Sequence, residues 1–236
     1  MRFPMHSEWS GQMNVNGWYK GARATARRIG VRRATEIMKG HEPWRSDWVS
    51  LGLRRDLDVP FPAPAAKIPL TIRPLCDEDW AALFDSSEPG ISDEERQLMT
   101  SRKELALERV GSPFVAVTAD GEPCYIQWLF SPHENERMRD FFNGVFPRLQ
   151  PDEMLLEGAF TPEKHRGKGI MPCAMAQIAE QAAARGARWV VTFVTEDNVP
   201  SLKGCDRAGF SPYIRRSVRW SGLRKTVRFG ELRVEG

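Results

Sequence analysis

A short glycine-containing loop between a predicted strand and a predicted helix constrains this sequence more than any other feature. The strand is Glu153–Thr161 (EMLLEGAFT), the loop follows as PEKHRGKG, and the helix is Pro172–Arg185. Gly167 and Gly169 lack the side chains that would keep an anion away from the backbone. The free N–H groups of the first helical turn favour negative charge. The loop therefore predicts an anion site, and a diphosphate is the expected ligand.

Three basic side chains, Lys164, Arg166 and Lys168, add positive charge to this loop. Two common phosphate-binding patterns do not fit it. The G-x-x-x-x-G-K-[ST] loop of nucleoside triphosphatases is absent from the sequence, and the third glycine of the dinucleotide pattern G-x-G-x-x-G would fall on Pro172. The diphosphate is therefore expected to belong to another class of ligand.

The composition excludes several classes of protein. With 236 residues, 41% hydrophobic and 28% charged, the chain is expected to be globular. Its four cysteines are far apart and it has only four histidines, which argues against a structural zinc site, another metal centre or a disulfide scaffold. A net charge of +3 is too small for an obligate nucleic-acid binder. Since no apolar run approaches a membrane span and no signal peptide is recognisable, we expect a cytoplasmic protein.

The sequence divides into three parts. Residues 1–59 contain 11 basic and 6 acidic residues and form a predicted basic helical extension. Residues 60–66 form a proline-rich linker, and residues 67–236 form the main domain, with an insertion at 131–152. The extension contains a predicted helix over Gly21–Lys39, flanked by Trp9, Trp18, Trp44 and Trp48. This helix is either a solvated helix that its tryptophans dock onto the domain, or a basic surface for an acidic partner or a membrane face.

Strands and helices alternate along the main domain. The Asp-Gly pair within Ala119–Glu122 predicts a hairpin turn, and the apolar run Trp189–Thr195 predicts a buried strand. Ser92 and Glu95 form a capping box at the start of a helix. The other expected elements are strands over residues 68–75, 114–118, 123–130, 212–220 and 226–234, and helices over 78–84, 134–145 and 201–208.

The spacing Lys164-x-x-Gly167-x-Gly169 resembles the [QR]-x-x-G-x-[GA] acyl-CoA signature of the GCN5-related N-acetyltransferase (GNAT) superfamily. The buried strand, Asn198 and the Ala208-Gly209-Phe210 turn follow in that family's order, so the resemblance extends over about residues 68–234. It implies an α/β (α+β) fold. A mixed, mostly antiparallel sheet of six to seven strands would be splayed between strands 4 and 5 and flanked by helices.

The resemblance also implies where acetyl-CoA, or another acyl-CoA, would bind as co-substrate. The pyrophosphate would lie on the amides of Arg166–Ile170, and the pantetheine arm would pair with strand Glu157–Ala159. Asn198 would lie near the pantetheine or act only as a helix cap. The implied binding residues are Gly158, Ala159, Phe160, Thr161, Lys164, His165, Arg166, Gly167, Lys168, Gly169, Ile170, Asn198 and Ser201.

Two carboxylates are candidates for the base that an ammonium acceptor requires. Glu153 lies thirteen residues before Arg166, which matches the base position of the histone-type members of the family. Glu157 lies four residues further on, and strand alternation places both on one face. Glu153 is either a base or a solvated residue at the start of the strand. Glu157 could act directly, through water, or on a cationic group of the substrate.

Cys205 stands where the family often has a tyrosine that protonates the departing thiolate. The resemblance leaves three interpretations of Cys205: a replacement acid, a core residue beside a water that protonates the thiolate, or a nucleophile that forms an acyl-enzyme. No neighbouring histidine in the sequence supports the third interpretation.

The acceptor is not specified by any motif. We expect an acetyltransferase acting on a small-molecule primary amine, such as an amino sugar, a nucleotide sugar or an amino acid. Alternatives are a longer acyl chain, delivered by acyl-CoA or acyl carrier protein, and a non-catalytic acyl-CoA-binding module.

The insertion residues Phe141, Phe142 and Phe146 could form a pocket wall or a core. The basic final hairpin could bind an anionic acceptor, bind the adenosine 3′-phosphate, or be a solvated edge. The oligomeric state is open, and a dimer is compatible with the sequence.

Overall fold

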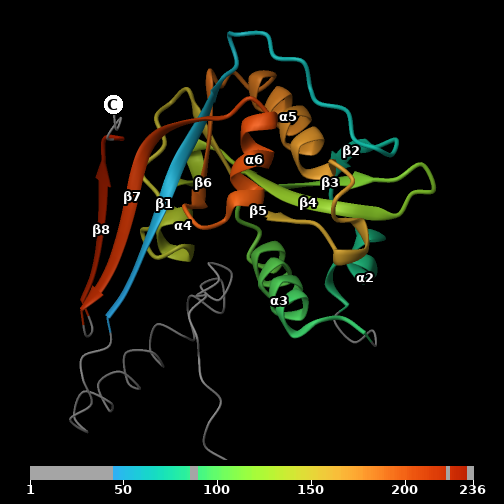
Figure 1. Ribbon diagram of the computed structural model, residues 1–236, viewed down its shortest axis with the longest axis horizontal. Coiled ribbons are helices and arrows are strands. Elements are labelled where there is room, and N and C mark those ends of the chain that lie inside the picture. Colours follow the sequence, from blue (N-terminus) through green and yellow to red (C-terminus); the bar gives the residue numbers. More distant parts are fainter. Residues whose placement is uncertain (1–44, 86–89, 222–223, 233–236) are drawn as a thin grey trace, which may run out of the picture.

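An eight-stranded mixed sheet forms the centre of the protein, with the strands in the order β2-β3-β4-β5-β6-β1-β7-β8 (Figure 1). The computed structural model describes residues 45–85, 90–221 and 224–232. Neighbouring strands are antiparallel except for β5 and β6, which are parallel. The strands are β1 Arg45–Asp56, β2 Thr71–Pro74, β3 Ser112–Val117, β4 Pro123–Phe130, β5 Glu153–Phe160, β6 Trp189–Thr195, β7 Ser211–Ser221 and β8 Arg224–Gly230.

Helices cover both faces of the sheet, with α5 and α6 on one face and α2, α3 and α4 on the other (Figure 1). Each face has its own buried apolar cluster, and the side chains of β4 are buried along its whole length. The helices are α2 Asp79–Phe84, α3 Asp93–Leu107, α4 Asn135–Phe141, α5 Ile170–Ala183 and α6 Val199–Arg207, with 3₁₀ turns at Pro132–Glu134 and Glu163–His165. The predicted mixed, mostly antiparallel sheet flanked by helices is confirmed.

Local sequence explains where the helices begin. The hydroxyl of Ser92 accepts a hydrogen bond from the Glu95 N–H at 3.2 Å, which caps α3 as predicted. The side chain of Asn198 likewise accepts from the Ser201 N–H at 3.2 Å at the start of α6. The start of α5 is different, because its cap residue Gly169 has no side chain to offer.

The sheet has one strand more than the six to seven predicted, because β1 lies inside it between β6 and β7. Its register runs from Ser50 opposite Thr195 to Asp56 opposite Trp189 on the β6 side. The prediction that residues 1–59 form an extension outside the domain is therefore wrong for residues 45–56. The sequence RSDWVSLGLRRD did not predict a strand inside the sheet, because its three arginines and two aspartates are typical of a solvent-exposed segment. The predicted helix over 21–39 lies outside the described residues.

The charges of β1 are accommodated by specific partners. Arg55 is only 3% exposed, forms an ion pair with Glu180 of α5 and donates to the Ala176 carbonyl at 3.2 Å. The guanidinium of Arg54 lies over the Trp189 ring, 4.3 Å from its centroid. The charge of β1 is typical of a solvent-exposed segment, but the contacts of its arginine side chains stabilise the strand inside the sheet.

The proline-rich segment 60–66 connects β1 to β2 within one sheet, so the predicted domain boundary there is not observed. A Cβ added to Gly209 would lie 2.9 Å from the Phe61 ring, which places that ring against the end of α6. Just beyond the segment, the Lys67 N–H donates to the Lys168 carbonyl at 2.8 Å. The connection therefore runs along the α5 and α6 face and reaches the glycine loop.

Strands β5 and β6 separate after a short paired stretch. Their register contains Glu153 opposite Trp189, Met154 opposite Val190 and Leu155 opposite Val191, and then ends. Beyond that point β5 continues beside β4, whereas β6 continues beside β1. Within the described part of the chain no strand pairs with the β6-facing edge of β5 after Leu155. This separation creates the opening in which the candidate site lies.

Candidate active site

A cavity of about 120 Å³ lies where β5 and β6 separate. Its walls come from both sides of the sheet, because α5 and α6 contribute residues from one face and α3 contributes Arg102 from the other. The lining residues are Arg102, Gln127, Glu157, Gly158, Ala159, Met171, Met175, Thr192, Phe193, Val194, Thr195, Asn198, Ser201 and Cys205. The cavity therefore links the α5–α6 side of the sheet to the α3 side.

A bulge in β5 shapes one wall of this cavity. Trp128 lies opposite Glu157 and Ile126 lies opposite Phe160, so β5 has one residue more than β4 between these pairs. Gly158 within the bulge has φ +77°, a conformation that favours glycine. Its N–H donates to Oε1 of Glu157 at 2.9 Å, which helps to fix the carboxylate of that half-buried residue.

The glycine loop after β5 presents its backbone to solvent. Gly167 and Gly169 have φ values of +74° and +73°, so both positions require the conformational freedom of glycine. A Cβ added to Gly167 would meet nothing within 4 Å. Gly169 caps the 14-residue helix α5 without a side-chain hydrogen bond. The first N–H groups of α5 therefore lack a side-chain cap and are suited to an anion.

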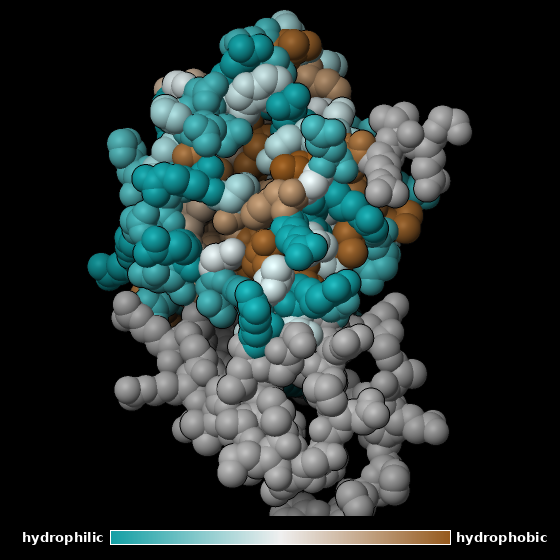
Figure 2. Space-filling model, turned by 90° about the vertical axis from the view of Figure 1, so that its left-hand side faces the viewer, coloured by the Kyte–Doolittle hydropathy of each residue, from teal (hydrophilic) through white to brown (hydrophobic). Residues whose placement is uncertain are grey.

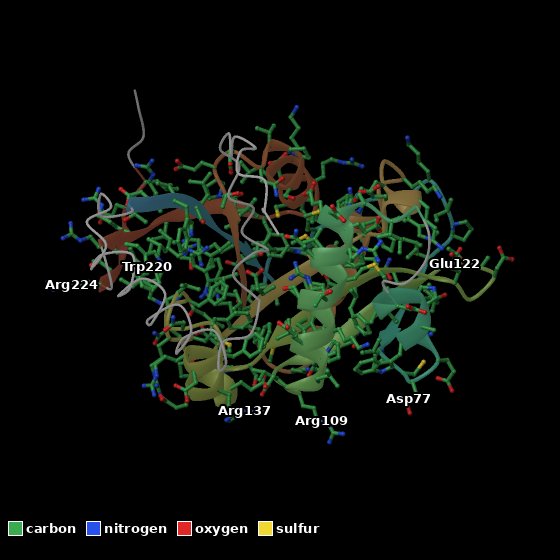
Figure 3. All side chains as sticks on the ribbon, turned by 90° about the horizontal axis from the view of Figure 1, so that it is seen from below. Asp77, Arg109, Glu122, Arg137, Trp220 and Arg224 are labelled. Carbon is green, nitrogen blue, oxygen red and sulfur yellow. The ribbon has the colours of Figure 1, made fainter. Side chains whose placement is uncertain are left out.

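The basic side chains of the loop are arranged differently from the sequence expectation. Lys164 forms an ion pair with Glu122 at 2.6 Å, and this contact lowers the pKa of the Glu122 carboxyl. Arg166 donates through Nε to the Thr161 carbonyl at 3.1 Å and lies 3.4 Å from a Glu163 oxygen. Both side chains thus brace the loop. Figure 3 shows Glu122 at one end of the sheet, opposite the end formed by β7 and β8.

Three other predicted contacts of acyl-CoA are buried in the protein. Phe160 is 3% exposed and belongs to the apolar cluster on the α3 side, and Ile170 is 2% exposed and belongs to the cluster on the α5 side. His165 is 5% exposed, and burial lowers its pKa although Glu122 lies 3.5 Å from its Nε2. The side chains of these residues are packed inside the protein, and only their backbone could face a ligand.

Arg207 was missed by the sequence reasoning, although it lies beside the glycine loop. Its Nη2 would be 3.7 Å from a Cβ added to Gly169. Because Arg207 comes from the last residue of α6, no local pattern connects it with a loop nearly forty residues earlier. Only the packing of α6 beside α5 brings this guanidinium to the anion site.

The two candidate bases are separated by the structure. Glu157 lines the cavity, whereas Glu153 does not. Glu153 lies at the closed end of the strand pair, opposite Trp189, and its Oε2 accepts from the Gln150 N–H at 2.9 Å. Of the two interpretations of Glu153, this geometry favours the residue at the start of the strand over the base, because its carboxylate caps the turn that leads into β5.

Cys205 lines the cavity from α6, yet its residue surface is fully buried. Its Sγ lies 4.0 Å from the sulfur of Met175. Burial, with a smaller contribution from Glu157, raises the pKa of this thiol to about 12. At neutral pH the thiol is protonated, which argues against a nucleophile.

Tyr125 and Gln127 lie on β4 beneath the cavity, and sequence reasoning identified neither. The Tyr125 hydroxyl donates to Oε1 of Gln127 at 2.7 Å, and both residues are almost fully buried. Desolvation raises the pKa of Tyr125 well above its usual value. A buried polar pair in an otherwise apolar strand was the only signal, since PCYIQWLF shows no alternation. The sequence also did not identify Arg102 as a cavity residue, because the many charged residues of α3 are typical of a solvent-exposed helix.

The insertion aromatics belong mainly to the core. Phe142 is 5% exposed and its ring contacts those of Phe130, Phe141 and Phe146 at centroid distances of 4.8 to 5.5 Å. Phe146 in turn contacts Phe193, which lines the cavity. The insertion therefore supports the cavity wall from behind.

The final hairpin uses two of its arginines in contacts to carboxylates. Arg215 forms an ion pair with Glu196 at 2.7 Å, and Arg219 forms one with Asp47 at 3.1 Å. Arg216 is buried, with its guanidinium 4.6 Å from the Phe193 ring centroid. Seen from the β8 edge, the surface shows mostly hydrophilic side chains around a smaller hydrophobic area (Figure 2). These contacts favour the solvated edge over a site for an anionic acceptor.

The described residues contain neither a cluster of metal ligands nor a membrane-spanning helix. No group of three or more His, Cys, Asp or Glu side chains in residues 45–85, 90–221 and 224–232 could hold a metal ion. In the same ranges, no helix has both the length and the hydrophobicity needed to cross a membrane.

Comparison with known proteins gives structural matches only. No family model matches the sequence, and no curated protein sequence matches it. The chain is similar to a solved structure of a fungal GCN5-related glucosamine N-acetyltransferase region within a multi-domain β-N-acetylglucosaminidase. The identity is 16% and the TM-score 0.51, over 80% of this chain and 22% of that one.

Two further structures are similar at lower scores. A GNAT-family acetyltransferase from Colwellia psychrerythraea has 14% identity and a TM-score of 0.48, over 86% of this chain and 74% of that one. A Drosophila protein has 16% identity and a TM-score of 0.44, over 79% of this chain. This chain spans 55% of the Drosophila protein, so the matched region is only part of it.

Proposed function

Because this chain has the fold of the GCN5-related N-acetyltransferases, we propose that it transfers an acetyl group from acetyl-CoA to the primary amine of a small molecule. One observation supports this proposal above all others: the cavity between the separated strands is lined by Glu157 and by Met171 of α5, directly after the glycine loop. The diphosphate and the thioester of one acyl-CoA molecule could therefore bind in neighbouring parts of the same opening.

The residues present fit acyl-CoA as a co-substrate. The amides at the start of α5 lack a side-chain cap, and the space above Gly167 is open. The β6-facing edge of β5 after Leu155 offers backbone donors and acceptors to an extended pantetheine arm, in the manner of an added strand. Lys168 and Arg207 would complement the phosphate charge at the loop.

Glu157 is the proposed base. An acceptor amine reaches the site mainly as an ammonium ion, and it becomes a nucleophile only after it loses a proton. The carboxylate of Glu157 lies on the cavity wall, where it can accept that proton directly or through a water molecule. The amine nitrogen then attacks the thioester carbonyl, the C–N bond forms, and the C–S bond breaks.

The bulge of β5 is proposed to stabilise the negative charge that develops on the thioester oxygen. Its Gly158 and Ala159 lie on the cavity wall, and a backbone N–H aimed at that oxygen would act as an oxyanion donor. Cys205 is proposed to be a packing residue, because a thiol with a pKa of about 12 is a weaker acid than the thiol of CoA that it would have to protonate. The thiolate would then leave without an internal acid and take its proton from the bulk solvent, to which Glu157 returns the proton that it accepted from the amine.

The proposal is tested by calorimetric titration with acetyl-CoA, followed by thiol release across a panel of amines. We expect binding that Gly167→Glu abolishes while the protein stays folded, since the new side chain puts bulk and negative charge above the loop; the positive φ of Gly167 should lower the melting temperature by only a few degrees, because it costs about 1–2 kcal/mol. Glu157→Gln should lower kcat by about 10²- to 10⁴-fold and leave acetyl-CoA affinity unchanged. Glu153→Gln is the matched control on the same strand, and it should retain kcat.

Each alternative gives a different result. Absence of acetyl-CoA binding by the wild-type protein would refute the proposal. A rate that rises with acyl chain length would identify a longer-chain acyltransferase, for which acyl carrier protein is the next donor to test. Binding without transfer to any amine would identify a non-catalytic acyl-CoA-binding module. A loss of kcat in Glu153→Gln rather than Glu157→Gln would exchange the roles of the two carboxylates.

A further inference from the structure

Gln127 occupies the position on β4 that lies opposite the β5 bulge. The strand pairs that flank the bulge leave this one β4 residue facing both Gly158 and Ala159. Gln127 is only 1% exposed, yet it lines the cavity, as do the two bulge residues. The bulge and the Gln127 side chain therefore form adjacent parts of one cavity wall.

Tyr125 fixes the orientation of the Gln127 amide. Its hydroxyl donates to Oε1 of Gln127 at 2.7 Å. Tyr125 is fully buried, and desolvation raises its pKa well above the usual value, so the hydroxyl keeps the proton that it donates. The amide oxygen is thus held by Tyr125, and the amide nitrogen Nε2 lies at the other end of the planar group.

The amide nitrogen of Gln127 carries two N–H donors that a ligand can use. Among residues 45–85, 90–221 and 224–232, the contact with Tyr125 is the one hydrogen bond of the Gln127 side chain. A buried amide is costly unless its donors find an acceptor. Because Gln127 lines the cavity, the acceptor is expected inside the cavity.

The proposed reaction creates an acceptor of this kind. When the deprotonated amine bonds to the thioester carbon, the C=O electron pair moves onto the oxygen. The pair returns when the C–S bond breaks, CoA leaves as a thiolate, and the nitrogen releases its extra proton to solvent. Backbone N–H groups and glutamine side chains both serve as donors to such an oxyanion. The bulge has one donor fewer to offer, because the Gly158 N–H already donates to Glu157 at 2.9 Å.

We infer that Gln127 donates a hydrogen bond to the thioester oxygen beside the backbone of the bulge, and that Tyr125 is the positioning residue that orients this donor. The inference rests on the proposed acetyl transfer and adds two residues to its chemistry. Tyr125 acts only through Gln127. The hydrogen bond from Gln127 strengthens as negative charge develops on the oxygen, so its loss affects turnover more than binding.

The first experiment observes the bound thioester in the absence of any amine. Acetyl-CoA with an isotope label at its carbonyl carbon is bound to the protein, and its C=O stretch is recorded by infrared difference spectroscopy. We expect a lower frequency in the wild-type protein than in Gln127→Met, because a donor to the oxygen weakens the C=O bond. Equal frequencies would show that Nε2 bonds only to water, and would overturn the inference.

The second experiment separates turnover from folding. Gln127→Met should lower kcat roughly 10²- to 10³-fold, the effect of losing one oxyanion donor, and leave acetyl-CoA affinity almost unchanged. It should also lower the melting temperature, because the Tyr125 hydroxyl is left buried without its acceptor. The double variant Tyr125→Phe/Gln127→Met removes both partners, so it should regain melting temperature without regaining kcat.

A purely structural role of the pair predicts the opposite pattern. Recovery of kcat together with melting temperature in the double variant would overturn the inference. Cys124→Ala is the matched control, because Cys124 is buried on the same strand, donates through Sγ to the Ala116 carbonyl at 3.3 Å and does not line the cavity. This control should lower the melting temperature and keep kcat.

Failure of the inference is distinguishable from failure of the proposed function. If Gln127 is not a donor, both proteins bind acetyl-CoA with the same C=O frequency, and the folded Gln127→Met variant acetylates amines at the wild-type rate. If the proposed function is wrong, the wild-type protein itself fails to bind acetyl-CoA, and this result would overturn both.

Discussion

Gly158→Ala tests whether the β5 bulge is required for the site. Gly158 has φ +77°, and a Cβ at this position would lie 3.0 Å from Cε3 of Trp128 and 3.2 Å from Cδ2 of Leu105. Both neighbours are buried, so neither can move away freely. The added methyl group therefore meets two separate penalties, one in the backbone and one in packing.

The two penalties can be estimated separately. A non-glycine residue in the left-handed region costs about 1–2 kcal/mol, and overpacking of a buried site costs about 1–3 kcal/mol. The free energy of unfolding should therefore fall by about 2–5 kcal/mol, which corresponds to a melting temperature lower by about 4–20 °C for a domain of this size. Gly121→Ala is the matched control, because Gly121 has φ +82° and nothing within 4 Å of an added Cβ.

The assay combines thermal unfolding with the amine acetylation rate. The control should lose only the backbone part, about 1–2 kcal/mol, and keep its kcat. Gly158→Ala should lose more stability and more kcat, since the bulge holds Glu157 and Ala159 at the cavity wall. If the two variants unfold at the same temperature, the packing argument is wrong. If Gly158→Ala keeps full kcat, the bulge has no part in the chemistry.

Three further predictions test other parts of the structure. Burial lowers the pKa of Lys225 to about 8, so the unfolded chain binds more protons between about pH 8 and its usual pKa of 10.5. The stability of the wild-type protein relative to Lys225→Met should therefore rise with pH across that window in chemical denaturation. Cys205→Ser should keep kcat within about tenfold, and the wild-type protein should form no acyl-enzyme by mass spectrometry, because its Cys205 thiol is protonated at neutral pH. A chain that starts at residue 60 lacks β1 and should lose its cooperative unfolding transition. A chain that starts at residue 45 keeps β1 and should keep the transition. A cooperative transition in the shorter chain would contradict the sheet order.

The elements with strong local signals were predicted well. Trp189–Thr195 is β6 with the predicted bounds, and the Asp-Gly turn joins β3 and β4. Such signals are local, because a continuous apolar run or a turn dipeptide acts over a few residues. The glycine loop belongs to the same class. Its two positive φ angles follow from the two glycines themselves.

Features that depend on distant partners could not be read from the sequence. Strand β1 contains arginines that would be costly in a sheet interior, and Arg55 is tolerated there because Glu180 and the Ala176 carbonyl, on a helix far along the chain, bind its guanidinium. Lys164 was expected to reach a phosphate, but the β3–β4 turn supplies Glu122 to bind it. In each case the charge of one residue was visible in the sequence and the position of its partner was not.

The choice between Glu153 and Glu157 shows where periodicity ceases to determine a site. Strand alternation places the two carboxylates on one face, but they are four residues apart, which is about 13 Å along a strand. Only one of them can lie where β5 and β6 separate, and that point is set by the last parallel pair, Leu155 opposite Val191. Strand β6 pairs with β1 along its other edge both before and after that point, whereas β5 bulges against β4 just beyond it. The position of the opening, and with it the choice of carboxylate, thus depends on how far β5 stays paired with β6, and the period of the strand does not specify that tertiary pairing.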